Sequence, residues 1–342
     1  MIDIDFYMKI AAFKQWIMDG NSFGLSTYKF LEGNRSKKPV VFNIETTNAC
    51  NMTCPFCPRT THMTRSIKTM EPKVFERIVA QLEPHPDKLW SMWADFAEWQ
   101  YKIPQSEQSE NAFFLYILPR VVVLHGYGDP LLDPHIPDYV GMMTKRNIPS
   151  YFSCNPANIQ MDKTERAFGN GLTYIKYSID SLTDSVRGRD AFAKDYPQIM
   201  KVLDMKAKGN YKTQVIITMI NLGQDSFDNL KEAFKGSDVY IYQKSLDQSW
   251  LTGKPAPKSI HWSEPCQIPW SSMTIKSDGM AASCEEDYNN EIILGDAKTT
   301  PLEHIWNGAE YDKLRRNHIY MMERTHCTDG TCDMRVFGRW LK

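Results

Sequence analysis

The sequence Ile44-Glu-Thr-Thr-Asn-Ala-Cys50-Asn-Met-Thr-Cys54-Pro-Phe-Cys57-Pro-Arg59 places three cysteines within eight residues. A strand is expected just before them, over Val40 to Thr46, so the cysteines lie in the loop at that strand's carboxyl end. Three thiolates from one loop can hold three irons of a cubic [4Fe-4S] cluster and leave the fourth iron open. The competing interpretation is structural zinc, whose ligands more often come as two Cys-x2-Cys-like pairs.

Length, charge and cysteine content limit the class of protein. A chain of 342 residues can form one large α/β barrel with a smaller unit. Lys and Arg number 40 against 41 Asp and Glu, without a long basic stripe, so we expect no nucleic-acid partner. No run of about 18 apolar residues and no signal-peptide pattern is found, so we expect no membrane association. Eight cysteines then indicate metal or redox chemistry in a cytoplasmic protein.

Short apolar strands alternate with amphipathic helices through most of the chain. Strands are expected over residues 120–125, 150–154, 174–180, 213–220 and 239–243, in addition to the first. This order predicts βαβ units and a parallel sheet, whose ligands bind beyond the carboxyl ends of the strands. We therefore expect an α/β fold.

The chain divides into segments around this pattern. Residues 1–38 are expected to form a helical extension with an amphipathic helix over 4–18, and residues 39–245 are expected to form the strand-helix domain. Within it, residues 84–119 form an insertion rich in Trp, Phe and Tyr, for which hydrophobic packing and substrate contact are both open. A Gly- and Pro-rich linker at 253–257 precedes a second unit over 260–342.

The spacing Cys-x3-Cys-x2-Cys, with Phe56 just before the last cysteine, resembles the signature of the radical S-adenosylmethionine (SAM) superfamily. The resemblance implies a partial (β/α)6 TIM-like barrel whose [4Fe-4S] cluster is held by Cys50, Cys54 and Cys57. It also implies that SAM chelates the open iron and is cleaved reductively to a deoxyadenosyl radical, which removes hydrogen from a substrate carbon. A reducing electron donor such as flavodoxin or ferredoxin is then an expected partner.

Two strand ends resemble the SAM-binding elements of this superfamily. Gly126-Tyr-Gly-Asp-Pro130 is similar to the Gly-Gly-Glu-Pro pattern, with Tyr in place of the first Gly of that pattern and Asp in place of Glu. Ser178-x-Asp180 is similar to the element that reaches the ribose and methionine parts of SAM, and Arg187 could pair with the SAM carboxylate. The resemblance assigns SAM contacts to Phe56, Tyr127, Gly128, Asp129, Ser178, Asp180 and Arg187.

Four late cysteines, Cys266, Cys284, Cys327 and Cys332, resemble the auxiliary-cluster domain called SPASM, or its shorter twitch form. The segment 274–280 reads as a hairpin, so a small hairpin and helix domain is expected. Four cysteines suit one fully ligated [4Fe-4S] cluster, which would relay electrons. The spacing of the last two departs from the tighter pair of the family, so a non-cysteine ligand could complete the set. Structural zinc is the alternative.

Cys154 stands apart at the expected end of the third strand, followed by Asn155-Pro156. A thiol at that edge could give a hydrogen atom to a substrate radical, which would make the protein a radical epimerase. Free cysteine more commonly behaves as a small buried hydrophobe. Both interpretations stay open.

The resemblance implies a radical SAM oxidoreductase, and we expect it to dehydrogenate a sugar-like or other small natural product with the auxiliary cluster as electron relay. The alternatives are a radical epimerase that uses Cys154, an enzyme that modifies a peptide or protein, and, from another class, a non-catalytic zinc-binding module. Neither the substrate nor the general base nor the oligomeric state follows from the residues.

Overall fold

The computed structural model describes residues 1–11, 24–54, 57–179, 192–220, 224–244 and 265–328. Four expected site residues, Phe56, Asp180, Arg187 and Cys332, lie outside these ranges, as does the linker at 253–257.

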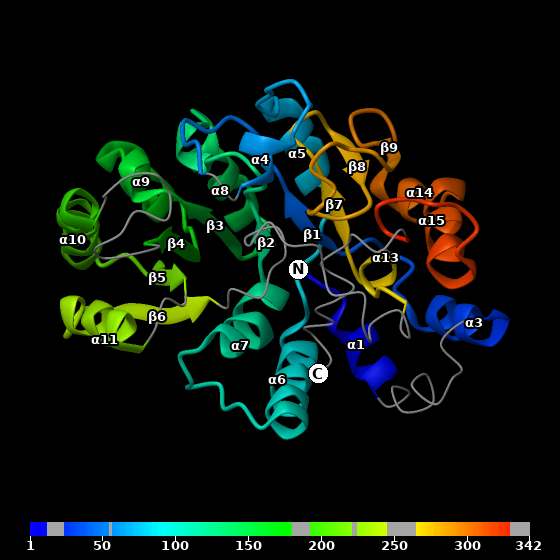
Figure 1. Cartoon of the computed structure of the whole chain (residues 1–342), viewed down its shortest axis with the longest axis horizontal. Coiled ribbons are helices and arrows are strands. Elements are labelled where there is room, and N and C mark those ends of the chain that lie inside the picture. The colour runs from blue at the N-terminus through cyan, green and yellow to red at the C-terminus, as the bar shows by residue number, and fades with distance from the viewer. Residues whose placement is uncertain (12–23, 55–56, 180–191, 221–223, 245–264, 329–342) are drawn as a thin grey trace.

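Within the described residues, one curved sheet carries the fold (Figure 1), with the strand order β6-β5-β4-β3-β2-β1-β7-β8-β9. The first six strands pair in parallel with their sheet neighbours. They confirm the predicted α/β architecture, a partial (β/α)6 barrel. The bounds are β1 (Val41–Ile44), β2 (Val122–Val123), β3 (Ser150–Cys154), β4 (Tyr174–Ser178), β5 (Gln214–Ile220) and β6 (Val239–Lys244).

Crossover helices cover the outer face of this sheet (Figure 1) and bury one side of each strand. α5 begins at Pro72, where the missing amide hydrogen of proline costs nothing because the first turn has no partner for it. α10 is helical from Phe192 and continues through Pro197. The bounds are α5 (Pro72–Val79), α8 (Ile136–Thr144), α9 (Met161–Gly169), α10 (Phe192–Lys208) and α11 (Gln224–Ala233).

The aromatic insertion forms helices that pack against the inner face of the sheet. Trp93 is fully buried, and its indole N–H donates to the Leu115 carbonyl oxygen at 2.7 Å. Phe113 stacks on Tyr242 of β6 with ring centroids 5.1 Å apart, in a hydrophobic cluster shared with α1. The helices of the insertion are α6 (Asp87–Tyr101), α7 (Glu110–Ala112), η2 (Phe113–Ile117) and η3 (Leu118–Arg120), and α1 spans Ile4–Ala11.

The C-terminal unit continues the barrel sheet. β7 (Met273–Ile275) pairs in parallel with β1, and β8 (Met280–Ala282) and β9 (Ile293–Asp296) follow antiparallel, which confirms the hairpin. Gly279 turns that hairpin with a φ of 83°, a conformation that favours glycine. Helices α13 (Ile268–Ser271), α14 (Leu302–Trp306) and α15 (Ala309–Tyr320) pack beside it, next to α3 (Leu25–Asn34) (Figure 1).

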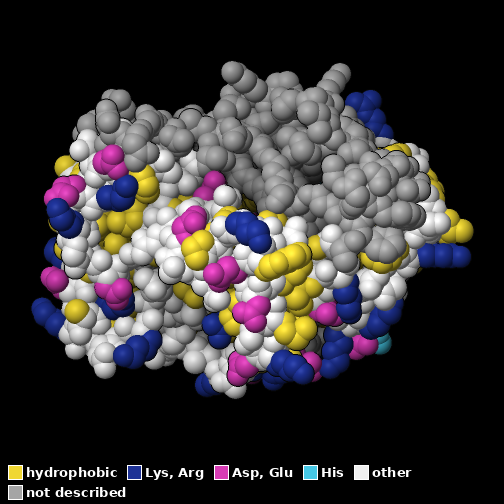
Figure 2. Space-filling view, turned by 90° about the horizontal axis from the view of Figure 1, so that it is seen from below, with side chains coloured by type: hydrophobic (Ala, Val, Ile, Leu, Met, Phe, Trp, Pro, Cys, Tyr) yellow, Lys and Arg dark blue, Asp and Glu magenta, His cyan; other side chains and the backbone are white. Residues whose placement is uncertain are grey.

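Charged side chains of both signs are interspersed over the described part of the face in Figure 2, as the balanced totals predict. In the described ranges, no helix has the length and apolar character needed to cross a membrane.

Candidate active site

A cavity of about 370 Å³ opens at the carboxyl ends of the parallel strands. The expected cluster ligands line it together with the expected SAM-binding strand ends, although these segments are far apart in the sequence. The structure therefore brings together Cys50, Cys54, Cys57, Tyr127, Gly128, Asp129, Cys154 and Ser178.

The cysteine loop presents its three thiols to this cavity. Cys54 is buried and Cys50 and Cys57 are half-buried, and burial raises the pKa of the Cys50 and Cys57 thiols. Arg59, in the short helix α4 (Pro58–Thr61), donates to the carbonyl oxygens of Asn48 and Met52. Three thiols on one loop, facing a cavity, fit a cluster that keeps one iron open.

A mononuclear metal would require several ligands to converge on one point. Among the described residues, no group of three His, Cys, Asp or Glu side chains does so. Thiolates on different irons of a cluster need not meet at one point, so the arrangement around Cys50, Cys54 and Cys57 is compatible with a cluster.

Glycine is required at two positions of the expected SAM-binding segment. A Cβ on Gly128 would collide with the backbone of Thr47 and Asn48, in the loop that leads to the first cysteine. A Cβ on Gly126 would collide with the carboxylate of Glu45. The backbone at the end of β2 therefore lies directly against the cysteine loop, close enough for one ligand to contact both segments.

The Asp129 side chain braces the neighbouring loops. One carboxylate oxygen accepts from the Leu131 amide at 3.0 Å, at the start of η4 (Pro130–Leu132). The other accepts from the Asn155 amide at 2.9 Å and from Asn158 Nδ2 at 2.7 Å, in η5 (Pro156–Asn158). These bonds fix the end of β2 relative to the loop after β3, so Asp129 holds the loops of the site in position.

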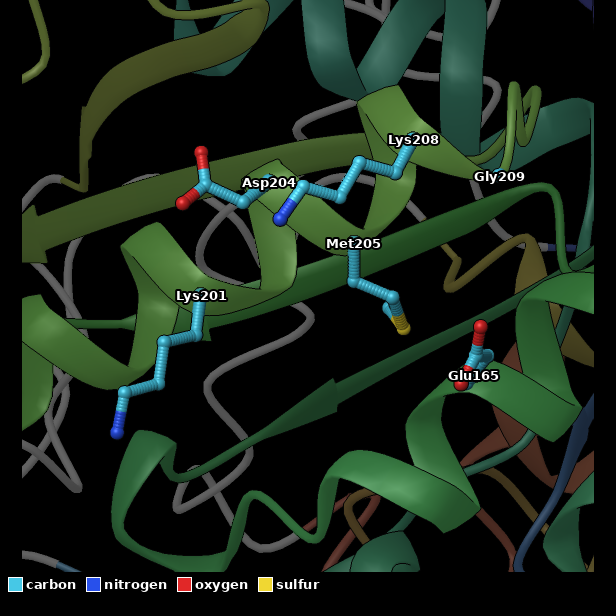
Figure 3. Close-up of a pocket in the computed structure, with 6 residues that line it drawn as sticks. All are labelled: Glu165, Lys201, Asp204, Met205, Lys208 and Gly209. Carbon is cyan, nitrogen blue, oxygen red and sulfur yellow. The ribbon is translucent and has the colours of Figure 1, made fainter.

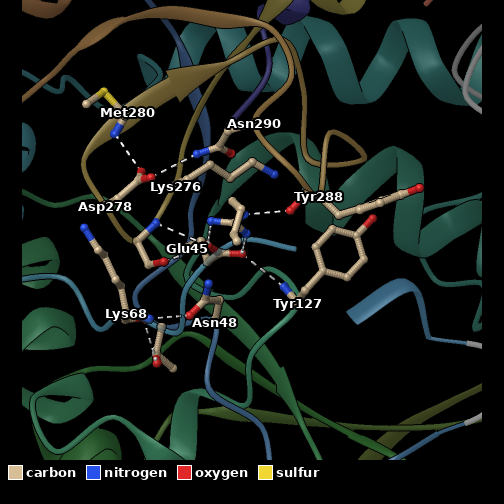
Figure 4. Close-up of polar contacts among 12 residues, drawn as sticks. Glu45, Asn48, Lys68, Tyr127, Lys276, Asp278, Met280, Tyr288 and Asn290 are labelled. Atoms are coloured by element: carbon tan, nitrogen blue, oxygen red, sulfur yellow. Dashed lines mark hydrogen bonds and ion pairs between the residues drawn. The ribbon is translucent and has the colours of Figure 1, made fainter. Parts of the chain in front are cut away.

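Glu45, which the sequence reasoning missed, links three parts of the site (Figure 4). Its fully buried carboxylate accepts from Arg65 through two bonds of 2.9 and 3.0 Å. It also accepts from the Ser277 hydroxyl at 2.9 Å and from the Tyr127 amide at 3.3 Å. Burial alone would raise the pKa of Glu45, but Lys276, Arg65 and Ser277 together lower it. Glu45 thus ties the strand end after β2 to the C-terminal unit.

Tyr127 extends from that strand end toward the segment after β8. Its hydroxyl donates to the Glu286 carboxylate at 2.9 Å, and its ring lies edge-on to Tyr288. Glu285 and Glu286 directly follow Cys284 and line the same cavity as the cysteine loop. Burial raises the pKa of Glu285, whose Oε2 atom is enclosed without a hydrogen-bond partner among the described residues.

A cationic and aromatic wall closes the cavity on the β4 and β6 side. Lys176 is 9% exposed, and its ammonium lies 5.1 Å from the Phe113 ring centroid and 5.6 Å from that of Tyr151. Lys244 donates to the Ser178 hydroxyl at 3.2 Å. Ser178 was predicted from its motif, but neither lysine was, because both are spaced like ordinary strand residues.

Cys154, at the end of β3, is 5% exposed, and its Sγ lies 3.8 Å from the Lys176 carbonyl oxygen. It is packed in the outer hydrophobic core, and it also borders the cavity.

The C-terminal cysteines lie on separate elements. Cys266 precedes α13 and is half-buried, whereas Cys284 after β8 and Cys327 after α15 are both buried.

A second hollow, of about 420 Å³, lies between α9 and α10 in the outer helical layer (Figure 3). Its lining carries charges of both signs, from Glu165, Lys201, Asp204 and Lys208. None of the expected site residues lines it, so the cavity at the strand ends is the candidate active site.

The chain matches two families. Residues 44–235 match the radical SAM superfamily, and residues 266–333 match SPASM, an iron-sulfur cluster-binding domain. The protein therefore belongs to the radical SAM superfamily and carries a SPASM domain at its C-terminal end. It is a radical SAM enzyme, with SAM and iron-sulfur clusters as cofactors, which replaces the zinc-module interpretation.

Individual relatives are distant. The chain is 20% identical to the S-adenosyl-L-methionine-dependent 2-deoxy-scyllo-inosamine dehydrogenase of Niallia circulans over 278 residues, 81% of this chain and 85% of that protein. Streptococcus suis SuiB bound to the precursor peptide SuiA is 12% identical, with a TM-score of 0.54, over 91% of this chain and 73% of SuiB. BtrN in complex with AdoMet and 2-DOIA is 15% identical, with a TM-score of 0.47, over 81% and 85% of the two chains. The likeness to SuiB supports the fold.

Proposed function

We propose that the protein is a radical SAM dehydrogenase of a sugar-like or other small polar natural product. SAM and its cluster would supply a deoxyadenosyl radical, which removes one hydrogen atom from the substrate. The auxiliary cluster would supply an acceptor for one further electron. A hydroxyl-bearing carbon that loses a hydrogen atom, an electron and the hydroxyl proton becomes a carbonyl. The chain must therefore orient the substrate and accept that proton.

The observation that carries this proposal is the shared cavity. Glu285 and Glu286 follow Cys284 directly and line the same cavity as Cys50, Cys54 and Cys57. Oxidation of a substrate radical requires an electron acceptor within reach, and this arrangement sets the C-terminal cysteine segment beside the substrate space. In the proposal, Cys50, Cys54 and Cys57 hold the SAM-binding cluster, and Cys266, Cys284, Cys327 and Cys332 hold the auxiliary cluster.

Glu285 is the group that we assign to accept the hydroxyl proton. It lines the cavity, and the hydrogen-bonding capacity of its Oε2 atom is unused by the described protein groups. Its neighbour Glu286 already accepts from the Tyr127 hydroxyl, which makes it the weaker candidate.

Two further observations favour dehydrogenation. The Niallia circulans relative is a dehydrogenase by name, although the identity is only 20%. Cys154, the hydrogen donor that epimerisation would need, borders the cavity but packs in the outer core, with its Sγ 3.8 Å from the Lys176 carbonyl oxygen.

The test is an anaerobic assay of the reconstituted enzyme with dithionite, in which iron, deoxyadenosine and oxidised product are measured. We expect about eight irons per chain, from two clusters of four irons each. Cys284→Ala should keep SAM cleavage and lose product, and Glu285→Gln should slow product formation while SAM cleavage continues. An enzyme that forms deoxyadenosine with a set of sugars and cyclitols but returns only epimers or unchanged substrate would refute the dehydrogenase assignment.

A further inference from the structure

Three hydrogen-bond donors converge on the β4 and β6 wall of the cavity. Lys176 lies in the middle of β4, and Lys244 is the last residue of β6. His125 follows β2 and lines the same cavity. The three come from strands separated by up to 119 positions in the sequence, and only the parallel pairing of the strands brings them together.

His125 has a defined donor atom. Its Nδ1 accepts from the Ser153 amide at 3.1 Å, so the neutral ring carries its proton on Nε2. Burial, together with the charges of Lys176 and Lys244, lowers the pKa of His125 to about 3, so the ring stays neutral at physiological pH. The wall therefore presents two ammonium groups and one imidazole N–H.

The carboxylates around the cavity are distributed unevenly. Glu285 and Glu286 enter from the C-terminal unit beside β1, and Asp129 is engaged by the loops after β2 and β3. Glu110 of α7, which packs near β6, is the acidic residue that lines the cavity there among the described residues. The charged residues described at this end of the cavity are thus two lysines and one glutamate.

Aromatic rings flank the Lys176 ammonium. Phe113 and Tyr151 flank the Lys176 ammonium, and Tyr242 stacks on Phe113. An ammonium held between rings is less hydrated than one in water, so it gains more from an incoming anion.

On these grounds we infer that the substrate carries an anionic group, a carboxylate or a phosphate, which Lys176, Lys244 and the His125 Nε2–H bind at this wall. This inference deepens the proposed function and rests on it. The anion would anchor one end of the substrate, and the rest would extend toward Glu285 and the cysteine loop. SAM also carries a carboxylate, so the experiment has to separate the two sources.

The experiment measures binding to the anaerobic holoenzyme by calorimetry, first with SAM alone and then at saturating SAM. The probes are D-glucuronate, D-glucose 6-phosphate and, as the neutral match, D-glucose. We expect at least one charged probe to bind tenfold or more tightly than D-glucose. Lys176→Met should remove that preference and leave the SAM dissociation constant within twofold, and Lys244→Met should remove the preference as well.

Lys206→Met is the matched control, because Lys206 is also 9% exposed but pairs with Asp238 outside the cavity. It should keep the preference for the charged probe. If Lys176→Met fails to fold, Lys244→Met, at the open end of β6, still decides the question. Equal binding of charged and neutral probes, or a loss of SAM affinity in place of probe affinity, would overturn the inference. Formation of oxidised product, measured in parallel with deoxyadenosine, tests the proposed function separately.

Discussion

Removing the charge of Glu45 should destabilise the protein and weaken SAM binding together. Glu45→Gln keeps the size of the side chain, but its amide can satisfy only part of the Arg65 guanidinium. The Arg65 side chain is 8% exposed and that of Glu45 is fully buried, so the cation stays in the interior without its counterion. Breaking a buried pair in this way typically costs about 3–5 kcal/mol. The Gln NH2 group cannot accept a hydrogen bond, so where it replaces Oε2 the bond from the Tyr127 amide is lost as well.

The measurement is the free energy of unfolding in urea, followed by tryptophan fluorescence under anaerobic conditions. Glu83→Gln is the matched control, because Glu83 forms an exposed ion pair with Lys38 at 2.9 Å. Exposed pairs contribute roughly 0–1 kcal/mol, so the control should change little. If Glu45→Gln costs no more than Glu83→Gln, the reasoning that Glu45 holds the site together is wrong.

The Glu45 carboxylate should also make the free energy of unfolding depend on pH. Its folded-state pKa lies below the ordinary value, so its stabilisation is fully present above the pKa of the unfolded chain. It is lost as the pH falls through the lower folded-state pKa. Below the unfolded-chain pKa of glutamate, about 4.3, wild type should therefore lose stability more steeply than Glu45→Gln. Because the Tyr127 amide would no longer be held, the SAM dissociation constant of the variant should also rise, whereas that of Glu83→Gln should not.

Three further substitutions test single features of the site. Gly128→Ala should abolish SAM binding, because its Cβ meets the Thr47 backbone, whereas Gly33→Ala, which meets nothing within 4 Å, should bind SAM normally in the same calorimetric assay. Cys154→Ser should leave product formation within a few-fold of wild type if Cys154 packs in the core, and a selective loss of product with continued SAM cleavage would favour the hydrogen-donor role. Phe113→Ala should cost about 3–5 kcal/mol of unfolding free energy by urea titration, since Phe113 is 2% exposed, and a cost below 1 kcal/mol would contradict the packing of the insertion on the sheet.

The cysteine loop and the strand-helix order could be predicted from the sequence because both are local. Cys50, Cys54 and Cys57 lie on one short loop, so their spacing alone indicates a shared group. The alternation of strands and helices likewise predicts a parallel sheet with its ligands at the strand ends. The hairpin around Gly279 was visible from its turn residues.

Tertiary structure alone decided which distant side chains meet. Glu45, Lys176, Lys244 and Glu285 look like ordinary strand or loop residues in the sequence. They acquire their roles because β1, β4 and β6 end at one edge of the sheet and the segment after β8 lines the same cavity. The pairing of β7 with β1 likewise could not be predicted, since strand partners across more than 200 residues leave no local signal. The sequence by itself determined the cofactor chemistry, whereas the charges that face the substrate depend on strand order and register, which are fixed only when the chain packs.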